Sequence, residues 1–265
     1  MAPAQEKGET AMITVKGLRA SYGGKEILHG IDAEFPQGKI TVIVGPNGCG
    51  KSTTLRSMVR MVPEVSGEIM LDGEDLRSLP PQKAAQRIAY LPQNRNVPDI
   101  TVERLVLHGR FPYLSYPRRY RKEDWDMVER SLGQVGITGL RSSRMENLSG
   151  GQQQKAYLAM VLAQDTGVVL MDEPTTFLDI KNQFEILDRG RALADEGRTV
   201  IMILHDFESV LHYADHVILM NDGRVLIASD AETVLRSDEI VDAFGVKPCF
   251  YETEDGLHCY VRQLG

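Results

Sequence analysis

The spacing of apolar residues predicts alternating strands and helices over most of the chain. Residues 12–19 alternate apolar and polar positions, as a half-buried strand does. Residues 39–44 form a β-branched run typical of a buried strand. The segment 51–62 carries apolar residues at i, i+3, i+4 and i+7, which predicts a helix with one apolar face. Residues 67–71, followed by Asp72-Gly73, predict a strand and a turn.

The middle of the chain has a helical pattern instead. Thr101 is a candidate N-cap for a helix that carries Val102, Leu105 and Val106, and a second helix is expected near 123–132. This pattern predicts a helical lobe, inserted over about residues 94–160, between two regions of strands.

Strands return in the second half of the chain. Residues 168–171 and 200–204 are short apolar runs, and residues 217–220 and 225–228 flank Asn221-Asp222-Gly223 as a hairpin would. A terminal hairpin is expected over about 247–263. The pattern therefore predicts an α/β domain over 12–265 with a mostly parallel core sheet and a helical insertion, after a flexible N-terminus of residues 1–11.

Composition narrows the class of protein. A net charge of −7 over 265 residues disfavours nucleic acid as the main partner. The first ten residues lack the apolar run of a signal peptide, and runs such as 200–204 are far shorter than the roughly 18 apolar residues that span a bilayer. Three cysteines without metal-ligand spacing are typical of free thiols in a reducing compartment. We expect a chain that does not cross a membrane by itself.

A phosphate-binding loop follows the predicted strand 39–44. The motif G-x-x-x-x-G-K-[ST] is matched by Gly45, Pro46, Asn47, Gly48, Cys49, Gly50, Lys51 and Ser52, and Thr53 follows it. Its glycines let backbone N–H groups face phosphate oxygens at a helix start, while Lys51 offsets phosphate charge and Ser52 ligates Mg²⁺. Cys49 has no accompanying base and is interpreted as a small loop residue.

Two carboxylates end the predicted strand 168–171. Asp172 stands where a phosphate-loop protein holds Mg²⁺ through water. Glu173, one residue further, points elsewhere and can orient or deprotonate the water that attacks the γ-phosphate. Many strands end in carboxylates, so these two residues alone are weak evidence for a nucleotide site. They become strong evidence in a chain that also contains a phosphate loop.

Together with these motifs, the run Leu148-Ser149-Gly150-Gly151-Gln152 makes the chain resemble the ATP-binding cassette (ABC) ATPases over nearly its whole length. The resemblance implies a P-loop fold with an additional antiparallel β part near the N-terminus. It also implies that Ser149, Gly150, Gly151 and Gln152 face the ATP bound to a second copy of the chain. Two copies would then enclose two ATP molecules with Mg²⁺.

The same resemblance assigns roles to single residues. Tyr22 corresponds to the aromatic residue that stacks on adenine, and Gln93 to the glutamine that senses Mg²⁺ and the γ-phosphate. Asp179 corresponds to the loop that crosses the dimer interface, and His205 to the histidine that positions the γ-phosphate and water. One departure is Gln153-Gln154-Lys155, where many relatives place arginine. His212 and His216, at i and i+4 without an evident third ligand, are interpreted as structural.

Three classes of protein are compatible with a phosphate loop of this kind. The chain could be the ATPase subunit of a membrane importer, a soluble ABC protein that acts on ribosomes or DNA, or a kinase of a small metabolite. The signature motif argues against a kinase, and the paired cassettes or basic extensions usual in the soluble class are missing. Finer resemblance, in the runs Ala89 to Gln93, Gly109 to Tyr113 and Asp172 to Ile180, points to ATPase subunits of bacterial importers for ferric siderophores, haem and cobalamin.

That resemblance implies a complex at the cytoplasmic face of the inner membrane. It would contain two copies of this chain and two polytopic membrane permease subunits, and an extracytoplasmic substrate-binding protein would deliver the cargo. Phe111 and Tyr113 belong either to the docking surface for the permease or to the interior of the helical lobe. The cargo pocket lies on other chains, so this sequence does not identify the cargo.

Overall fold

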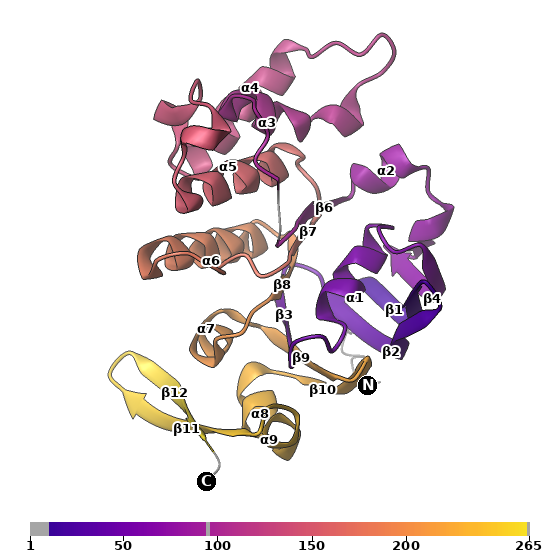
Figure 1. The fold of residues 1–265 in the computed structure, drawn as a ribbon, viewed down its shortest axis with the longest axis vertical. Coiled ribbons are helices and arrows are strands. Elements are labelled where there is room, and N and C mark those ends of the chain that lie inside the picture. Colours follow the sequence, from indigo (N-terminus) through magenta and orange to yellow (C-terminus); the bar gives the residue numbers. More distant parts are fainter. Residues whose placement is uncertain (1–10, 94–95, 264–265) are drawn as a thin grey trace, which may run out of the picture.

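The computed structural model describes residues 11–93 and 96–263, whose strands form two sheets and a separate hairpin (Figure 1). The first sheet is antiparallel, in the order β2-β1-β4-β5, and the second has the order β10-β9-β3-β8-β7-β6. The strands of the first sheet are β1 (Ala11–Tyr22), β2 (Lys25–Pro36), β4 (Glu64–Leu71) and β5 (Glu74–Asp75). Those of the second are β3 (Ile40–Val44), β6 (Ile88–Leu91), β7 (Val168–Met171), β8 (Thr199–Ile203), β9 (His216–Asn221) and β10 (Arg224–Ser229).

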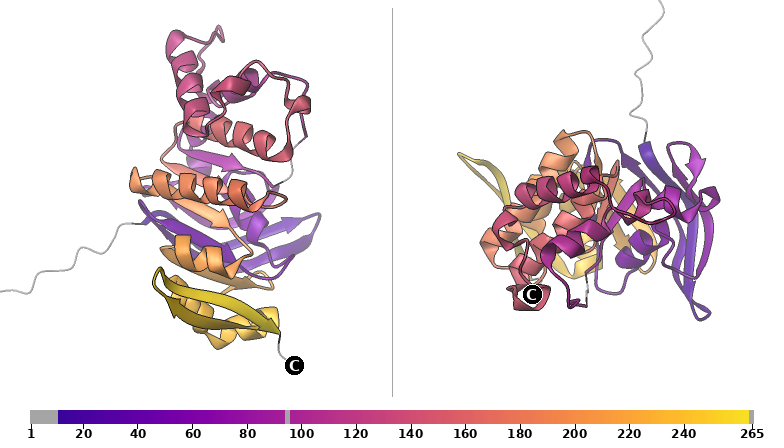
Figure 2. Two further views of the ribbon diagram at one scale, coloured as in Figure 1. Left: turned by 90° about the vertical axis from the view of Figure 1, so that its left-hand side faces the viewer. Right: turned by 90° about the horizontal axis from the view of Figure 1, so that it is seen from above.

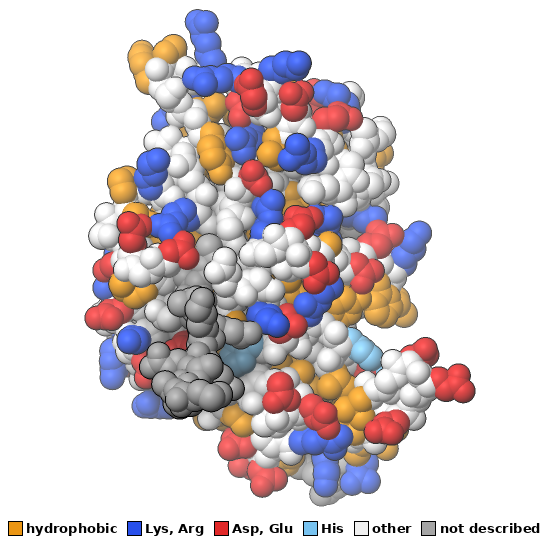
Figure 3. Space-filling view, turned by 180° about the vertical axis from the view of Figure 1, so that it is seen from behind, with side chains coloured by type: hydrophobic (Ala, Val, Ile, Leu, Met, Phe, Trp, Pro, Cys, Tyr) orange, Lys and Arg blue, Asp and Glu red, His pale blue; other side chains and the backbone are white. Residues whose placement is uncertain are grey.

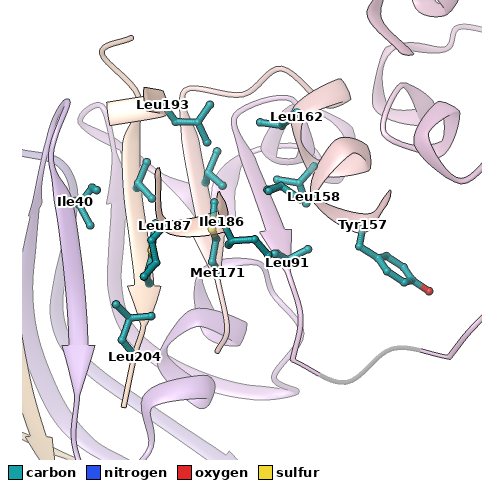
Figure 4. Close-up of a cluster of buried hydrophobic side chains, with 14 of the residues drawn as sticks. Ile40, Leu91, Tyr157, Leu158, Leu162, Met171, Ile186, Leu187, Leu193 and Leu204 are labelled. Atoms are coloured by element: carbon teal, nitrogen blue, oxygen red, sulfur yellow. The ribbon is translucent and has the colours of Figure 1, made fainter. Parts of the chain in front are cut away.

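The second sheet is parallel except for β10, which pairs antiparallel with β9. Its central strands are buried on both faces, and successive side chains enter two different hydrophobic clusters. In β3, Ile40 and Val42 face the helices, whereas Ile43 faces the antiparallel sheet. Figure 4 shows the helix-side cluster, where Met171 and Leu204 of the sheet region lie near Ile186 and Leu187. The predicted α/β class with an antiparallel part and helices is confirmed.

Three helices form the region at the top of Figure 1: α3 (Val102–His108), α4 (Lys122–Gln134) and α5 (Gly150–Ala163). α5 packs on both α3 and α4. Thr101 occupies the N-cap position of α3 as expected, but its hydroxyl is buried and accepts no hydrogen bond from the helix. The helix start is held instead by backbone bonds from Val102 and Glu103 N–H to Ser143 and Arg141 carbonyls.

Several elements differ from the sequence prediction. α1 spans Lys51–Met58 and ends earlier than expected, because Arg60 adopts a left-handed conformation with φ 58°. Strand β2 was not predicted, although residues 31–35 alternate buried and exposed positions; register shifts in its pairing with β1 interrupt this alternation only in the first half of the strand. The remaining helices are α2 (Pro81–Ala85), α6 (Ile180–Asp195), α7 (Phe207–Tyr213), α8 (Ala231–Arg236) and α9 (Asp238–Phe244).

The chain ends in a hairpin of β11 (Val246–Thr253) and β12 (Gly256–Gln263), and β12 packs against α7 (Figures 1 and 2). The N-terminus expected to be flexible falls, apart from residue 11, outside the described residues. Within residues 11–93 and 96–263, a helix with the length and apolar character needed to span a bilayer does not occur.

Candidate nucleotide site

The predicted phosphate loop connects the end of β3 to the start of α1. Gly45 has a φ of 155°, and a Cβ added there would lie 2.2 Å from the carbonyl oxygen of Met220. Gly50 is the N-cap of α1 with a φ of 109°, and its added Cβ would lie 2.7 Å from Leu28. Only glycine fits at these two positions, so the loop passes close to the sheet and leaves the N–H groups of the first turn of α1 unpaired within the helix.

Lys51 extends back over this loop. Its Nζ donates hydrogen bonds to the carbonyl oxygens of Gly45, at 2.7 Å, and Pro46, at 2.9 Å. The side chain is buried, and this desolvation lowers the pKa of the ammonium group. The cation is therefore held inside the loop that would surround phosphate groups.

Asp172 lies fully buried at the carboxyl end of β7. One carboxylate oxygen accepts a hydrogen bond from Ser52 Oγ at 2.7 Å, and the other accepts one from Tyr90 OH at 2.8 Å. Burial raises the pKa of Tyr90 above its usual range, so its hydroxyl remains a donor. The hydroxyl of Ser52 and the carboxylate of Asp172 are the oxygen ligands that Mg²⁺ prefers. Sequence analysis missed Tyr90, although its position near the end of β6 places it at the same sheet edge.

Glu173 is bound on both carboxylate oxygens. Oε1 lies 2.8 Å from His205 Nε2, and Oε2 accepts hydrogen bonds from Gln93 Nε2 at 2.5 Å and Thr176 Oγ1 at 3.1 Å. Gln93, Glu173 and His205 follow the neighbouring parallel strands β6, β7 and β8, and this adjacency brings them together. Glu173 also has a left-handed backbone with φ 49°, a conformation that is strained for a residue with a side chain.

A cavity of about 250 Å³ lies between the phosphate loop, Glu173 and the antiparallel sheet. Its lining includes Tyr22, Asn47, Gly48, Lys51, Thr53 and Glu173. Tyr22 lines this cavity and is 39% exposed. The structure therefore places the predicted aromatic residue, phosphate loop and carboxylate around one space.

The signature residues lie elsewhere, at the start of α5. Ser149 is the N-cap of this helix and forms a capping box with Gln152, through bonds of 3.0 and 3.3 Å. A Cβ on Gly151 would lie 2.8 Å from Asn182 Nδ2. Asn182 in turn donates from its backbone and side chain to Asp179, each at 2.8 Å. These backbone and side-chain bonds from Asn182 lower the pKa of Asp179, which therefore remains an anion beside the signature.

Thus the predicted residues form two groups in one chain. In the first, the phosphate loop and Glu173 line the cavity, Asp172 bonds to Ser52, and Gln93 and His205 bond to Glu173. The second joins Ser149 to Gln152 with Asp179 on an exposed surface that also carries Phe177, which is 95% exposed. Sequence analysis missed a link between the groups: Gln154 Nε2 donates to the carbonyl oxygen of Pro174 at 2.6 Å, directly after Glu173.

The unusual Gln153-Gln154-Lys155 run also has a structural role. Lys155 forms an ion pair with Glu185 of α6, and Gln153 Nε2 donates to the carbonyl oxygens of Met145 and Leu148. The side chains that replace the expected arginine therefore fasten α5 to its neighbours.

Comparison with known proteins agrees with this geometry. Residues 28–176 match the family model of the ABC transporters. The chain is 41% identical to the achromobactin transport ATP-binding protein CbrD of Dickeya dadantii, over 90% of this chain and 87% of the relative. It is 38% identical to the ferric enterobactin transport ATP-binding protein FepC of Escherichia coli, over 87% and 86%. The structure of cbiO1 from Clostridium perfringens, part of the ABC transporter complex cbiONQ, superposes with a TM-score of 0.75 at 27% identity, covering 88% of this chain and 93% of that one.

The chain belongs to the ABC transporter family. It is an ATP-binding subunit of the kind that hydrolyses ATP to power transport. Membership in this family implies dimerisation and membrane permease partners.

Proposed function

We propose that two copies of this chain enclose two molecules of ATP with Mg²⁺, and that closing and reopening of this dimer drives an importer in the membrane. The observation that carries the proposal is the position of Glu173, which is held between His205 and Gln93 beside the cavity lined by the phosphate loop. A carboxylate fixed on both oxygens can orient a water molecule and accept its proton.

The other residues of this group would bind the nucleotide. Lys51 and the N–H groups from Gly48 to Thr53 would contact phosphate oxygens, and Tyr22 would stack on the adenine. Ser52, Asp172 and Gln93 would hold Mg²⁺, which supplies positive charge to the phosphate oxygens when bound. In the structure, Lys51 Nζ already has backbone partners, so ATP binding would exchange two carbonyl contacts for phosphate contacts.

The second group of residues would act on ATP bound to the other copy. Ser149, Gly150, Gly151, Gln152 and Asp179 lie outside the cavity that contains Lys51 and Glu173, and all belong to helix N-termini or N-caps. A helix start with free N–H groups suits a γ-phosphate presented by a second molecule. Neither group is complete without the other, which supports a dimer as the hydrolytic unit.

The membrane partner is proposed to dock in a groove of about 480 Å³ between the end of α1, α2 and β6. Its walls include Met58, Met61, Leu76, Ala84, Tyr90 and Gln164. Met61 is 62% exposed although it is a large apolar residue. An apolar groove of this size suits a short helix of a permease subunit. Because Tyr90 both lines the groove and donates to Asp172, an occupant would contact a residue of the nucleotide site.

Phe111 and Tyr113 lie beside this groove and are partly exposed, at 48% and 36%. Tyr113 OH donates to the carbonyl oxygen of Gln164, and the guanidinium of Arg118 lies 4.6 Å from the Phe111 ring centroid. These exposures favour the docking surface over the interior of the lobe, the two positions that the sequence left open.

The proposed cargo is an iron-siderophore, haem or cobalamin-type compound. Relatives at 38–41% identity over most of the chain include proteins named for achromobactin and ferric enterobactin transport. The proposed location is the cytoplasmic face of the inner membrane, peripheral to a permease that works with an extracytoplasmic substrate-binding protein. Acidic and basic side chains are interspersed over the face in Figure 3, which offers little attraction to a nucleic acid.

The partner is testable by affinity capture from detergent-solubilised membranes of the native cell. The bait is the Glu173→Gln chain with MgATP, and the comparison is the same bait carrying Met61→Glu. We expect the first bait to capture a polytopic membrane protein and the second bait to lose it. Burying the new carboxylate in an apolar groove would carry a large desolvation cost. Val261→Glu, at an apolar residue of the terminal hairpin that is 50% exposed, serves as the matched control. Capture of ribosomes or DNA-repair proteins instead would replace the importer by the soluble class of ABC protein.

The cargo requires a separate test. A strain without this chain is supplied with ferric siderophores, haem or cobalamin, and uptake of each labelled compound is measured. We expect uptake of one of these classes to return with the wild-type chain and not with Glu173→Gln. If a permease is captured but uptake of all three classes is unchanged by the deletion, the importer assignment stands and the cargo assignment is wrong.

A further inference from the structure

Three potential metal ligands meet where the terminal hairpin packs on α7. Glu208 and His212 lie one turn apart on α7, and His258 comes from β12. Glu208 Oε1 is 2.9 Å from His212 Nε2 and 2.6 Å from His258 Nδ1, and the two nitrogen atoms are 3.3 Å apart. His212 was interpreted from the sequence as structural, because its third partner lies 46 residues further along the chain.

The spacing of these atoms suits one small cation. A tetrahedral ion with ligand bonds of about 2.0–2.1 Å keeps its ligand atoms about 3.3 Å apart. The nitrogen pair already has this separation, and the carboxylate oxygen needs to withdraw by about 0.4 Å from His212 Nε2 and about 0.7 Å from His258 Nδ1. Neutral imidazoles can each present an unprotonated nitrogen by moving their proton to the other ring nitrogen, so the ligands need not lose a net proton.

Neighbouring groups hold two of the three ligands in place. The second oxygen of Glu208 accepts a hydrogen bond from Cys259 N–H at 2.7 Å. The ring of Tyr251 stacks on His258, with centroids 5.4 Å apart. Such outer contacts fix the orientation of metal ligands and reduce the entropy lost on binding.

The charge and exposure of the cluster also fit a cation. Glu208 supplies a carboxylate whose Oε1 lies within hydrogen-bond distance of both imidazoles. His212 is 39% exposed, which leaves a path for the ion and room for water as a further ligand. Cys259 is buried and contacts Glu208 through its backbone N–H, and the group of possible ligand atoms consists of Glu208, His212 and His258.

We propose that Glu208, His212 and His258 form a binding site for a zinc-class divalent transition metal, which fastens the terminal hairpin to α7. Two imidazoles with one carboxylate select such ions over Mg²⁺ and Ca²⁺, which prefer oxygen ligands. α7 begins two residues after His205, so the site lies on the helix that follows the nucleotide site without sharing a residue with it.

The test uses the full chain without nucleotide and without a histidine tag, titrated with Co²⁺ and followed by visible absorption. We expect one equivalent of bound Co²⁺ with a four- or five-coordinate spectrum, displaced by Zn²⁺ and unaffected by millimolar Mg²⁺. Glu208→Gln, His212→Ala and His258→Ala should each weaken binding at least about tenfold. His108→Ala, at an exposed histidine of α3, is the matched control and should bind like the wild type.

Variants are compared only if they bind ATP as the wild type does, and a second measurement avoids variants altogether. In the wild-type chain, Zn²⁺ should slow diethylpyrocarbonate modification of His212 and His258, while His108 reacts at an unchanged rate. Absence of stoichiometric Co²⁺ binding, equal binding by all four variants, or equal protection of His108 would each overturn the site.

Discussion

Glu173 Oε1 and His205 Nε2 lie 2.8 Å apart, although 32 residues of chain separate them. They follow β7 and β8, adjacent parallel strands whose carboxyl ends meet at one sheet edge. With Gln93 on the opposite oxygen, the carboxylate is held from both sides. Its position is thus fixed by the strand order of the sheet, and the Glu173 side chain would need little reorganisation to act on a water molecule beside bound ATP.

Replacing Glu173 by glutamine should separate binding from hydrolysis. The amide oxygen can still accept the hydrogen bonds from Gln93 and Thr176, but the amide cannot accept a proton from water, so we expect ATP turnover to fall by about 10²-fold or more. Phosphate release measures turnover, and equilibrium titration should give ATP affinity close to that of the wild type. Gel filtration with MgATP should show a persistent dimer.

Glu185→Gln is the control for this experiment, because Glu185 lies on α6 and pairs with Lys155. Its turnover should stay within about twofold of the wild type, since ion pairs at partly exposed positions contribute little. A normal rate in Glu173→Gln would remove this residue from the base role.

Replacing Lys51 by alanine should weaken nucleotide binding. The side chain supplies the one ammonium group held within the loop by the Gly45 and Pro46 carbonyls, and ion-paired hydrogen bonds to phosphate are strong in a desolvated site. We expect at least about a tenfold loss of ATP affinity, measured by calorimetry. Lys247→Ala, at an exposed lysine of β11, should bind normally. Unchanged affinity in Lys51→Ala would contradict the assignment of the phosphate loop.

The sequence predicted those elements whose structure is determined by neighbouring residues in the chain. The run 39–44 and the phosphate loop were located because a β-branched strand, glycines and a helix start follow one another directly. The antiparallel sheet was expected from family resemblance, and β2 was missed although residues 31–35 alternate buried and exposed positions, because register shifts interrupt this pattern earlier in the strand. The end of α1 at Met58 was missed, because the spacing of apolar residues does not indicate that Arg60 adopts a left-handed conformation.

Contacts between distant residues were the least predictable. Tyr90 donates to Asp172 across 82 residues, and His258 reaches Glu208 across 50. Both contacts arise from pairing or packing of whole elements, β6 with β7 and β12 with α7, rather than from any motif. The spacing of apolar residues in the sequence can predict which face of a helix or strand a side chain lies on. Only the tertiary structure determines which residue of another element packs against it.

Gly151→Ala should impair the dimer without impairing nucleotide binding by one chain. The new methyl group would lie 2.8 Å from Asn182 Nδ2, so the amide must move and its bond to Asp179 weakens. Displacing these groups by even a fraction of an ångström disturbs their fit to the partner's nucleotide, and we expect turnover to fall roughly tenfold. Gly139→Ala is the matched control, because an added Cβ there meets no atom within 4 Å. Equal turnover by the two variants would show that this surface does not contribute to hydrolysis.

Thiol labelling should distinguish the three cysteines and report on the phosphate loop. Cys49 and Cys259 are buried, and this desolvation raises the pKa of both thiols, that of Cys259 to about 12. Since the thiolate is the reactive form and a raised pKa reduces it at pH 8, both should react with iodoacetamide much more slowly than the half-buried Cys249. Mass spectrometry of tryptic peptides measures each rate, and the urea-unfolded chain, where all three should react alike, is the reference. MgATP should slow Cys49 further and leave Cys249 unchanged, because a ligand that binds only the closed loop suppresses its opening. If Cys49 reacts as fast as Cys249, or if MgATP protects both equally, then the loop is not packed against the sheet as the structure describes.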